Sequence, residues 1–382
     1  MDLSSELIHS LLPLYMAVGL GASTLTIGIV EGIAEATAMV VKVFSGALSD
    51  FFRRRKPLVV LGYGLAALTK PVFPLAPTLG WIVAARFADR VGKGIRGAPR
   101  DALIADLAPP ALRGASFGLR QALDTVGGAG GPLLAIGAMA YFAGDFQAAF
   151  WVAVVPAFLA VLLLLFGVEE PSRPARETAS GTDNGARRLR LADATRLGRG
   201  YAVVVGIAAV LTLARFSEAF LVLRAQNVGL PTAMAPWVMV VMSVVYAGVS
   251  FPAGAAADRG RGPRLLSAGL WALIASDVVL ANARDGGRVF VGAALWGLHM
   301  GLTQGLLAAL VAASAPADLR GTAFGVFNLV CGIALLVASM LAGWLWDAFG
   351  PAYTFYAGAA ISLIAWIALL RHGGAATDLR RS

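Results

Sequence analysis

Charged residues between positions 86 and 101 suggest the first chemistry in this chain. The stretch begins inside an apolar segment, yet it carries Arg86, Asp89, Arg90, Lys93, Arg96, Arg100 and Asp101. A charge at the centre of a lipid bilayer costs at least about 2.5–3.5 kcal/mol unless it is paired or faces water. We therefore expect this segment to be a helix that lines a polar pathway.

Other apolar segments carry charges at helical spacing. Glu31, Glu35 and Lys42 are separated by four and seven positions, which places them on one face of a helix. Arg86, Arg90 and Lys93 form a second such face, with Asp89 and Arg96 beside it. Arg120 with Asp124, and Arg215 with Glu218, have the spacing of ion pairs within a helix.

Two interpretations of these charges compete. In the first, Glu31, Glu35, Asp124 and Glu218 carry protons, because burial favours a neutral carboxyl group and a nearby arginine favours the ionised one. Arg86 and Arg90 then control those carboxyl groups or bind an anionic group of a substrate. In the second, the charges form a permanent buried ion-pair network that is purely structural.

The second half of the chain differs in charge from the first. Its segment from Gly292 to Leu307 carries Trp296, His299, Thr303 and Gln304 where the first half has charges. The candidates for substrate contact or charge control are Arg86, Asp89, Arg90, Lys93, Arg96, Arg120, Arg215, Tyr246, Trp296, His299 and Gln304. With three histidines and one cysteine, no metal site of recognised spacing is visible, and we expect no cofactor.

The composition is that of an all-α integral membrane protein. Of 382 residues, 58% are hydrophobic and 14% are charged, against about 25% charged in soluble domains. A span takes about 20 apolar residues, and twelve are expected. Their approximate ranges are 3–20, 26–48, 58–75, 80–104, 114–141, 148–168, 201–223, 234–257, 265–282, 288–313, 322–346 and 352–371.

The twelve spans divide into two related halves. A polar linker at 169–200 separates a six-helix unit at 1–168 from another at 201–371, and residues 372–382 form a tail. Ala47–Asp50 resembles Ala255–Asp258, and Arg113–Gly118 resembles Arg320–Gly325 at nearly the same offset. A duplicated six-helix unit is typical of secondary transporters, whose binding site lies between the two units.

The loop charges predict the orientation in the membrane. Nineteen cationic residues lie in the tail and in loops on the side of the termini, and three lie in the opposite loops. By the positive-inside rule, both termini are expected in the cytoplasm, in a cytoplasmic membrane of bacterial type. The net charge of +9 is explained in this way, so we expect no nucleic-acid partner.

Two motifs resemble the Major Facilitator Superfamily. Residues 46–56, from Gly46 through Asp50 to Lys56, look like the signature loop between its second and third helices, and 254–264 resemble a degenerate copy. Gly127, Gly131 and Pro132 are similar to the Gly-Pro motif of proton-coupled drug exporters. The resemblance implies two pseudo-symmetric six-helix bundles.

The resemblance also implies a conformational gate at the signature loop, where the cluster latches the two halves in the outward-open state. A simpler alternative is that the loop only determines topology. Asp50 at the membrane edge favours the gate, because an aspartate there is costly without a partner. The gate candidates are Gly46, Asp50, Arg54, Lys56, Arg100, Asp101, Arg113 and Asp258.

These observations predict a secondary transporter that moves a small organic solute by alternating access, driven outward by protons. Its expected partners are the solute, protons and the lipid bilayer, and it is expected to be a monomer and not an enzyme. One alternative is an organic-anion uniporter, symporter or exchanger that uses Arg86, Arg90 and Arg120. Metal-ion efflux and a membrane sensor without transport are further alternatives.

Overall fold

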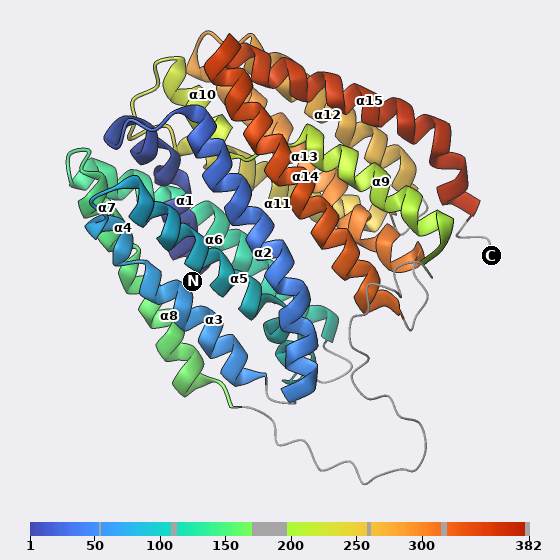
Figure 1. Ribbon diagram of the computed structural model, residues 1–382, viewed down its shortest axis with the longest axis horizontal. Helices are drawn as coiled ribbons and strands as arrows, with labels where there is room; N and C mark the ends of the chain where they lie inside the picture. Colours follow the sequence, from blue (N-terminus) through green and yellow to red (C-terminus); the bar gives the residue numbers. More distant parts are fainter. Residues whose placement is uncertain (53–54, 108–112, 170–196, 258–260, 315–318, 379–382) are drawn as a thin grey trace.

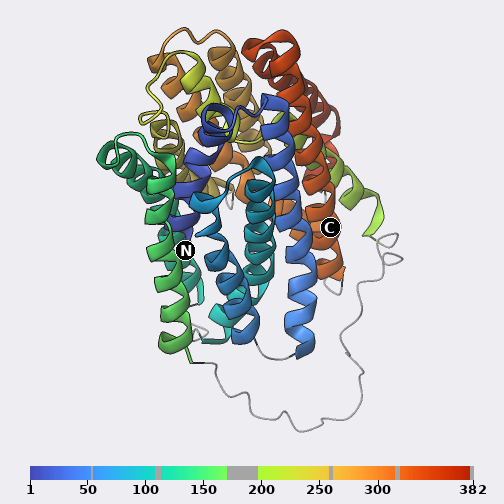
Figure 2. The ribbon, with the colours of Figure 1, turned by 60° about the vertical axis from the view of Figure 1, so that its left-hand side comes forward.

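The computed structural model describes residues 1–52, 55–107, 113–169, 197–257, 261–314 and 319–378. These residues form helices whose axes run roughly along one common direction (Figures 1 and 2). The backbone N–H and C=O groups of a helix bond to one another within the helix, and the lipid tails of a bilayer offer them no partners. The predicted all-α membrane fold is therefore confirmed.

The first six predicted spans correspond to helices, two of which are interrupted. Breaks occur near Pro71 and Pro156, because proline lacks the amide hydrogen that continues a helix. The helices are α1 Asp2–Leu14 with the π-helix η1 Tyr15–Gly19, α2 Thr24–Phe52, α3 Lys56–Thr69 with α4 Val72–Leu75, α5 Leu79–Leu107, α6 Arg113–Tyr141, and α7 Phe146–Val152 with α8 Val154–Gly167.

The last six predicted spans also correspond to helices, and the first of these is broken in its middle. They are α9 Gly198–Ala214 with α10 Ala219–Asn227, α11 Trp237–Ala256, α12 Gly262–Ala281, α13 Gly286–Ser314, α14 Arg320–Phe349 and α15 Pro351–Asp378. The four residues between α9 and α10 are not helical, although the sequence predicts one continuous span over 201–223.

Apolar character is distributed unevenly between the halves. Within the described ranges, eight helical stretches are long and apolar enough to cross a membrane, and only Lys56–Leu75 and Phe146–Gly167 belong to the first half. Helices α2, α5 and α6 are not among these stretches, and they carry the charges noted above. These charged helices must face one another or water rather than lipid.

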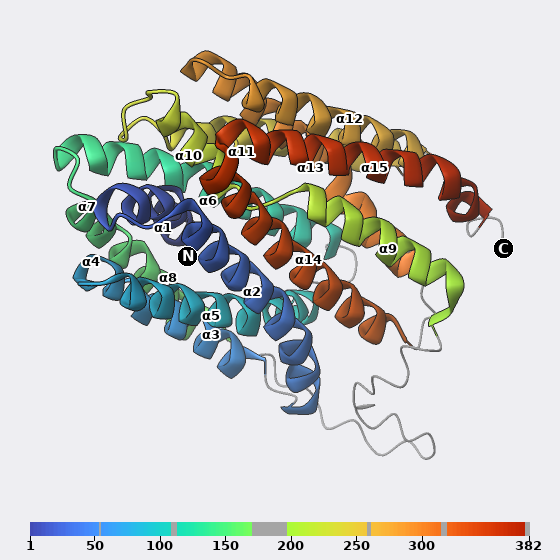
Figure 3. The same ribbon diagram turned by 45° about the horizontal axis from the view of Figure 1, so that its top comes forward.

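Helices α1–α8 lie on one side and α9–α15 on the other, with α2 and α14 side by side between them (Figure 3). Glycine permits this approach. A Cβ at Gly28 would overlap the carbonyl oxygen of Ser339, and one at Gly343 would lie 2.6 Å from the Cα of Leu25. Small residues allow such close helix contacts in membranes.

A carboxylate from the second half caps the first turn of α2. Asp347 on α14 accepts hydrogen bonds from the backbone N–H groups of Thr24, at 3.1 Å, and Leu25, at 2.8 Å. An anion at a helix N-terminus is favoured by the helix dipole and by the unpaired amide groups there. We call this end of the bundle the Thr24 end and the opposite end the Phe52 end.

Toward the Phe52 end, α2 and α14 line a cavity between the two halves. The second half of α2 contributes Glu35, Met39 and Lys42 to cavity walls, and the first half of α14 contributes Asn328 and Leu335. The same two helices stay in close contact from Leu25 and Gly343 at the Thr24 end as far as Ala36 and Gly332, where a Cβ on the glycine would lie 3.4 Å from the Ala36 Cα. In this conformation the two halves are in contact at the Thr24 end and enclose a cavity in the middle of the molecule.

Candidate functional site

A central cavity lies between the two halves. It has a volume of about 570 Å³ and is continuous in its lining with two smaller chambers of about 250 and 270 Å³, all three of which share Met39 and Gln304. The first half contributes most of the charged side chains on the walls, and the second half contributes Met239, Met242 and Met300. The charged groups therefore gather on the side of the first half, and the second half adds polar side chains among its methionines.

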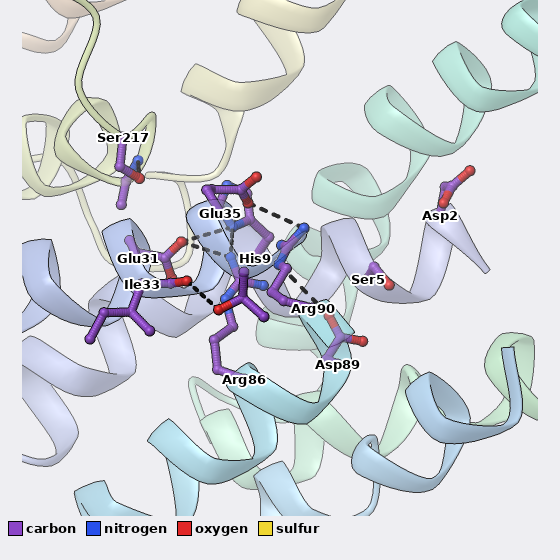
Figure 4. A network of polar contacts seen from close by, with 12 residues as sticks. Asp2, Ser5, His9, Glu31, Ile33, Glu35, Arg86, Asp89, Arg90 and Ser217 are labelled. Atoms are coloured by element: carbon purple, nitrogen blue, oxygen red, sulfur yellow. Dashed lines mark hydrogen bonds and ion pairs between the residues drawn. The ribbon is translucent and has the colours of Figure 1, made fainter. Parts of the chain in front are cut away.

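Two arginines of α5 pair with two glutamates of α2 beside this cavity (Figure 4). Arg86 Nη2 donates to Glu31 Oε2 at 2.7 Å, and Arg90 Nη1 lies 3.2 Å from Glu35 Oε1. Because both partners repeat after four residues, consecutive turns of the two helices are matched. Arg86, Arg90 and Glu31 are almost completely buried, so each charge is compensated where water is absent.

His9 on α1 completes the inner pair. Arg86 Nη2 lies 2.6 Å from His9 Nδ1, and Glu31 Oε2 lies 3.6 Å from the same nitrogen. Since the guanidinium group can only donate, His9 Nδ1 accepts and carries no proton. The sequence marks this histidine only weakly, because a single histidine in a helix has no distinctive spacing.

Asp89 pairs with a lysine that sequence reasoning missed. Lys70 Nζ donates to Asp89 Oδ1 at 2.8 Å and to Ser5 Oγ at 3.1 Å, and both charged side chains are buried. The signal was available, since Lys70 is the only charged residue between positions 57 and 85. A lone charge in an apolar span indicates a buried partner.

Glycines set the position of α5. A Cβ at Gly92 would lie 2.7 Å from the carbonyl oxygen of Gly62 on α3, and one at Gly94 would lie 2.6 Å from the Cβ of Val41 on α2. The helix is therefore clamped between two neighbours. Lys93, between these glycines, is exposed and lines the central cavity.

A second charge cluster lies farther along α5 and α6. Arg120 pairs with Asp124 at 2.9 Å, as its spacing predicts, and with Asp101 at 3.4 Å. Arg100 lies 3.5 Å from both aspartates. These side chains are partly exposed, and Arg100 and Asp124 line the wide part of the cavity.

The cavity divides the predicted site residues into two groups. Residues that line it or its chambers are Glu35, Arg90, Lys93, Arg96, Arg100, Asp124, Arg215, Glu218, Tyr246, His299 and Gln304. Glu31, Arg86, Asp89, Asp101, Arg120 and Trp296 do not line it. Trp296, a candidate for substrate contact in the sequence, does not reach these walls, since its ring is fully buried and packs 5.3 Å from the ring of Phe216.

The predicted helical pair of Arg215 and Glu218 is wrong. Both residues lie in the break between α9 and α10, where Arg215 has an extended backbone, and no ion pair joins them in the described structure. The Ser217 N–H group is satisfied by Ser339 Oγ at 3.2 Å. Irregular backbone inside a membrane protein is tolerated where it borders a cavity, and broken helices often form transporter binding sites.

Most of the gate candidates are not described. The side chains of Asp50 and Arg113, the surroundings of Gly46, and the whole of Arg54 and Asp258 lie outside the described residues. Lys56 is described, and its Nζ donates to the carbonyl oxygen of Leu165 at 2.8 Å.

The glycines of the Gly-Pro motif pack α6 against α1. A Cβ at Gly127 would lie 2.9 Å from the Cβ of Asp2, and one at Gly131 would lie 2.5 Å from the Cβ of Glu6. Pro132 follows inside the same helix. In this conformation the motif therefore brings Glu6 to the wall of the cavity.

A second missed residue is Asp277 on α12. Its side chain is completely buried, and neither oxygen has a hydrogen-bond partner among the described residues. The carboxylate faces Gly358 of α15, where a Cβ would lie 2.7 Å from Asp277 Oδ2. It is the only charged residue between positions 265 and 283, so the signal resembles that of Lys70.

Known proteins resemble the chain over almost its whole length. The Major Facilitator Superfamily model matches residues 1–214 and again 202–379. An uncharacterized MFS-type transporter of Methanocaldococcus jannaschii is 32% identical over 384 residues, covering 97% of this chain and 91% of that protein. The inner membrane transport protein YajR of Escherichia coli is 26% identical over 365 residues, covering 91% and 75%.

A solved structure shows the same fold. The peptide transporter POT aligns with a TM-score of 0.80 at 14% identity, over 99% of this chain and 93% of that one. At this identity the likeness concerns architecture alone. Together with the family match, the central cavity and the paired bundles, these findings show that the chain belongs to the Major Facilitator Superfamily and is a multi-pass membrane transporter of a small solute.

Proposed function

We propose that the chain exports a small organic solute across a cytoplasmic membrane in exchange for protons. The observation that carries this proposal is that carboxyl groups of both halves, Glu6 and Glu35 from the first and Glu218 from the second, lie on the walls of one chamber. Glu35 is paired with Arg90 at 3.2 Å, whereas Glu218 has no ion-pair partner in the described structure. Two such groups differ in their readiness to take a proton.

Proton coupling follows from what each group does when it changes charge. Protonation of Glu35 removes its attraction to Arg90, which then keeps only the weaker contact with Asp89 at 3.9 Å and stays at the cavity wall. Protonation of Glu218 removes a negative charge from the half that must move against the first. Alternating access then requires only that the two halves rock about the cavity.

The orientation belongs to the same proposal. The positive-inside rule assigns the Phe52 end to the cytoplasm, so the cavity of this conformation opens inward. The relative from Escherichia coli is an inner membrane transport protein, which supports a cytoplasmic membrane for this chain. The Gly-Pro motif of Gly131 and Pro132 supports export.

The anion alternative that uses Arg86, Arg90 and Arg120 is less well supported. Each of these arginines already has a carboxylate within 3.2 Å. An anionic solute would have to displace that carboxylate, and breaking a buried pair is costly.

Proton movement in inverted membrane vesicles tests the proposal. Vesicles are acidified, and a pH-sensitive dye reports proton release when cationic, neutral or anionic compounds are added. We expect compound-dependent release that is lost in Glu35→Gln and in Glu218→Gln. Glu169→Gln is the matched control, because Glu169 is exposed just after the end of α8 and does not line the cavity.

Two results would contradict the proposal. If both cavity variants release protons as the control does, neither carboxyl group couples transport to protons. If a compound drives protons in the same direction as itself, the transporter is a symporter and the export assignment is wrong.

A further inference from the structure

The chamber of about 270 Å³ differs from the rest of the cavity in its charge. It is enclosed by α9, α13 and α14 of the second half together with Met39 of α2. Its walls are formed by Met39, Leu211, Thr212, Arg215, His299, Thr303, Gln304, Leu307, Phe327, Asn328 and Cys331. Arg215 is the one charged side chain among these described lining residues, and none of them is acidic.

Arg215 forms no ion pair with a carboxylate among the described residues, although Glu218 lies on a wall of the adjoining chamber. Each described arginine of the α5 clusters has an aspartate or glutamate within 3.5 Å, but no ion pair to Arg215 exists among the described residues. Arg215 is held in the break after α9, where it lines both this chamber and the neighbouring one that contains Glu218. An arginine in this setting presents five donors and a charge to whatever enters.

A neighbouring amide adds a donor of the same polarity. Tyr246 donates its hydroxyl hydrogen to Gln304 Oε1 at 3.1 Å. Because the amide oxygen is occupied, the NH₂ group of Gln304 is the part left to interact with a solute. Gln304 lines the chamber together with Arg215, so the polar groups at this place favour an acceptor that carries negative charge.

The remaining walls are suited to an apolar body. Leu211, Leu307 and Phe327 lie on three different helices around the same space. His299 is turned toward α12, where its Nδ1 donates to the Gly269 carbonyl oxygen at 2.9 Å. A pocket with mostly apolar walls and a few convergent polar groups is the usual form of a small-molecule site.

We propose that this chamber binds the carboxylate end and the adjoining apolar body of a small monoanionic organic solute, with Arg215 and Gln304 as its ligands. The inference rests on the proposed function only in taking this cavity as the transport site. The proposed ligand is Arg215, which forms no ion pair among the described residues, and not an arginine of α5, since those arginines are already paired.

Electrostatics also predicts how Glu218 affects the affinity of the chamber for an anion. Glu218 lies three residues after Arg215 and lines the adjoining chamber. An ionised Glu218 repels an anion bound at Arg215, and a neutral side chain does not. The Glu218→Gln variant should therefore bind the anion more tightly than the original chain.

Binding to the purified full-length protein in detergent tests the proposal. Three probes share one apolar body and differ only at the end, namely 3-phenylpropanoate, 3-phenylpropanamide and 3-phenylpropylamine. We expect the carboxylate to bind at least about tenfold more tightly than the amide or the amine. Arg215→Gln should remove this preference, Gln304→Leu should reduce it, and Glu218→Gln should increase the affinity for the carboxylate.

The matched control is Arg288→Gln. Arg288 is exposed beside Asp285 at the start of α13, away from the chamber, and its loss should leave all three affinities unchanged. If Arg215→Gln fails to fold, the opposite effects expected for Gln304→Leu and Glu218→Gln still decide the question. The proposal is overturned if the carboxylate has no advantage over the amide, or if Arg215→Gln keeps that advantage.

Failure of this inference can be told apart from failure of the proposed function. If carboxylate binding depends on Arg215 but vesicles release no protons, the proposed proton exchange is wrong and the proposed anion site stands. If the amine or amide drives proton release but the protein in detergent shows no preference for the carboxylate, the proposed anion site is wrong and proton coupling stands.

Discussion

Three buried charged residues of α5 each pair with a residue of opposite charge, and each partner comes from another helix. Arg86 meets Glu31, Arg90 meets Glu35, and Asp89 meets Lys70. Only the second of these pairs borders the cavity. The two interpretations of the sequence therefore apply to different pairs. The two pairs away from the cavity are candidates for a structural role, and the pair at the cavity wall is a candidate for proton coupling.

The Lys70 and Asp89 pair should stabilise the fold. Asp89→Asn leaves the Lys70 ammonium group buried without its carboxylate, which we expect to cost about 3–5 kcal/mol of stability. Thermal unfolding of the purified protein measures this loss. The double variant Lys70→Met/Asp89→Leu, which buries no charge, should recover most of it, and equal stability of Asp89→Asn and the original chain would show that the pair contributes nothing.

Glu31 and Glu35 should differ in what they affect. Glu31→Gln removes the buried partner of Arg86 and should lower thermal stability by a similar amount, since Glu31 does not line the cavity. Glu35→Gln should lower stability less, because its side chain is partly exposed, and should abolish solute-dependent proton release. Equal losses of stability in both variants would contradict this division.

At the scale of helices, glycines decide where the charged segments can lie. Helix α5 approaches α3 at Gly92 and α2 at Gly94, and α6 approaches α1 at Gly127 and Gly131. The break between α9 and α10 is the other decisive element, because it removes Arg215 and Glu218 from a common helix face and places both at the cavity.

Two glycines of α6 make a matched comparison. At Gly131 a Cβ would lie 2.5 Å from the Cβ of Glu6 and 2.8 Å from the Leu7 nitrogen, whereas a Cβ at Gly128 would meet no atom of the described residues within 4 Å. Gly131→Ala should destabilise the protein by about 1–3 kcal/mol through overpacking. Gly128→Ala should be neutral or stabilise by up to about 1 kcal/mol, because alanine favours helix. Thermal unfolding of both variants measures the difference, and the reverse order would show that α1 does not pack as described.

On the scale of the whole molecule, the two halves meet at the Thr24 end and leave a cavity in the middle. Close contacts of α2 with α14 and the cap that Asp347 provides to Thr24 and Leu25 hold this end together. A transporter that alternates must break these contacts to open on that side.

Removing the Asp347 carboxylate should shift the population toward a state open at the Thr24 end. Spin labels at Val18 and Tyr353, both exposed, report the separation there by double electron–electron resonance in a Cys331→Ser background. Asp347→Ala should add a longer distance that the parent lacks, because the two amide hydrogen bonds are lost. Asp285→Ala, which removes an exposed loop carboxylate, is the control. Identical distance distributions in both variants would show that Asp347 does not hold this end closed.

The sequence by itself determined the fold, because hydropathy, duplicated motifs and the cost of charge in a bilayer each act locally along the chain. It also indicated which segments carry the site, since Glu35, Arg90 and Glu218 are charges in apolar spans. Only the tertiary structure decided which charges have partners, because Glu31 with Arg86 and Lys70 with Asp89 join residues on different helices. It also decided that Arg215 faces an acid-free chamber, since that depends on a break in the helix that local pattern does not reveal.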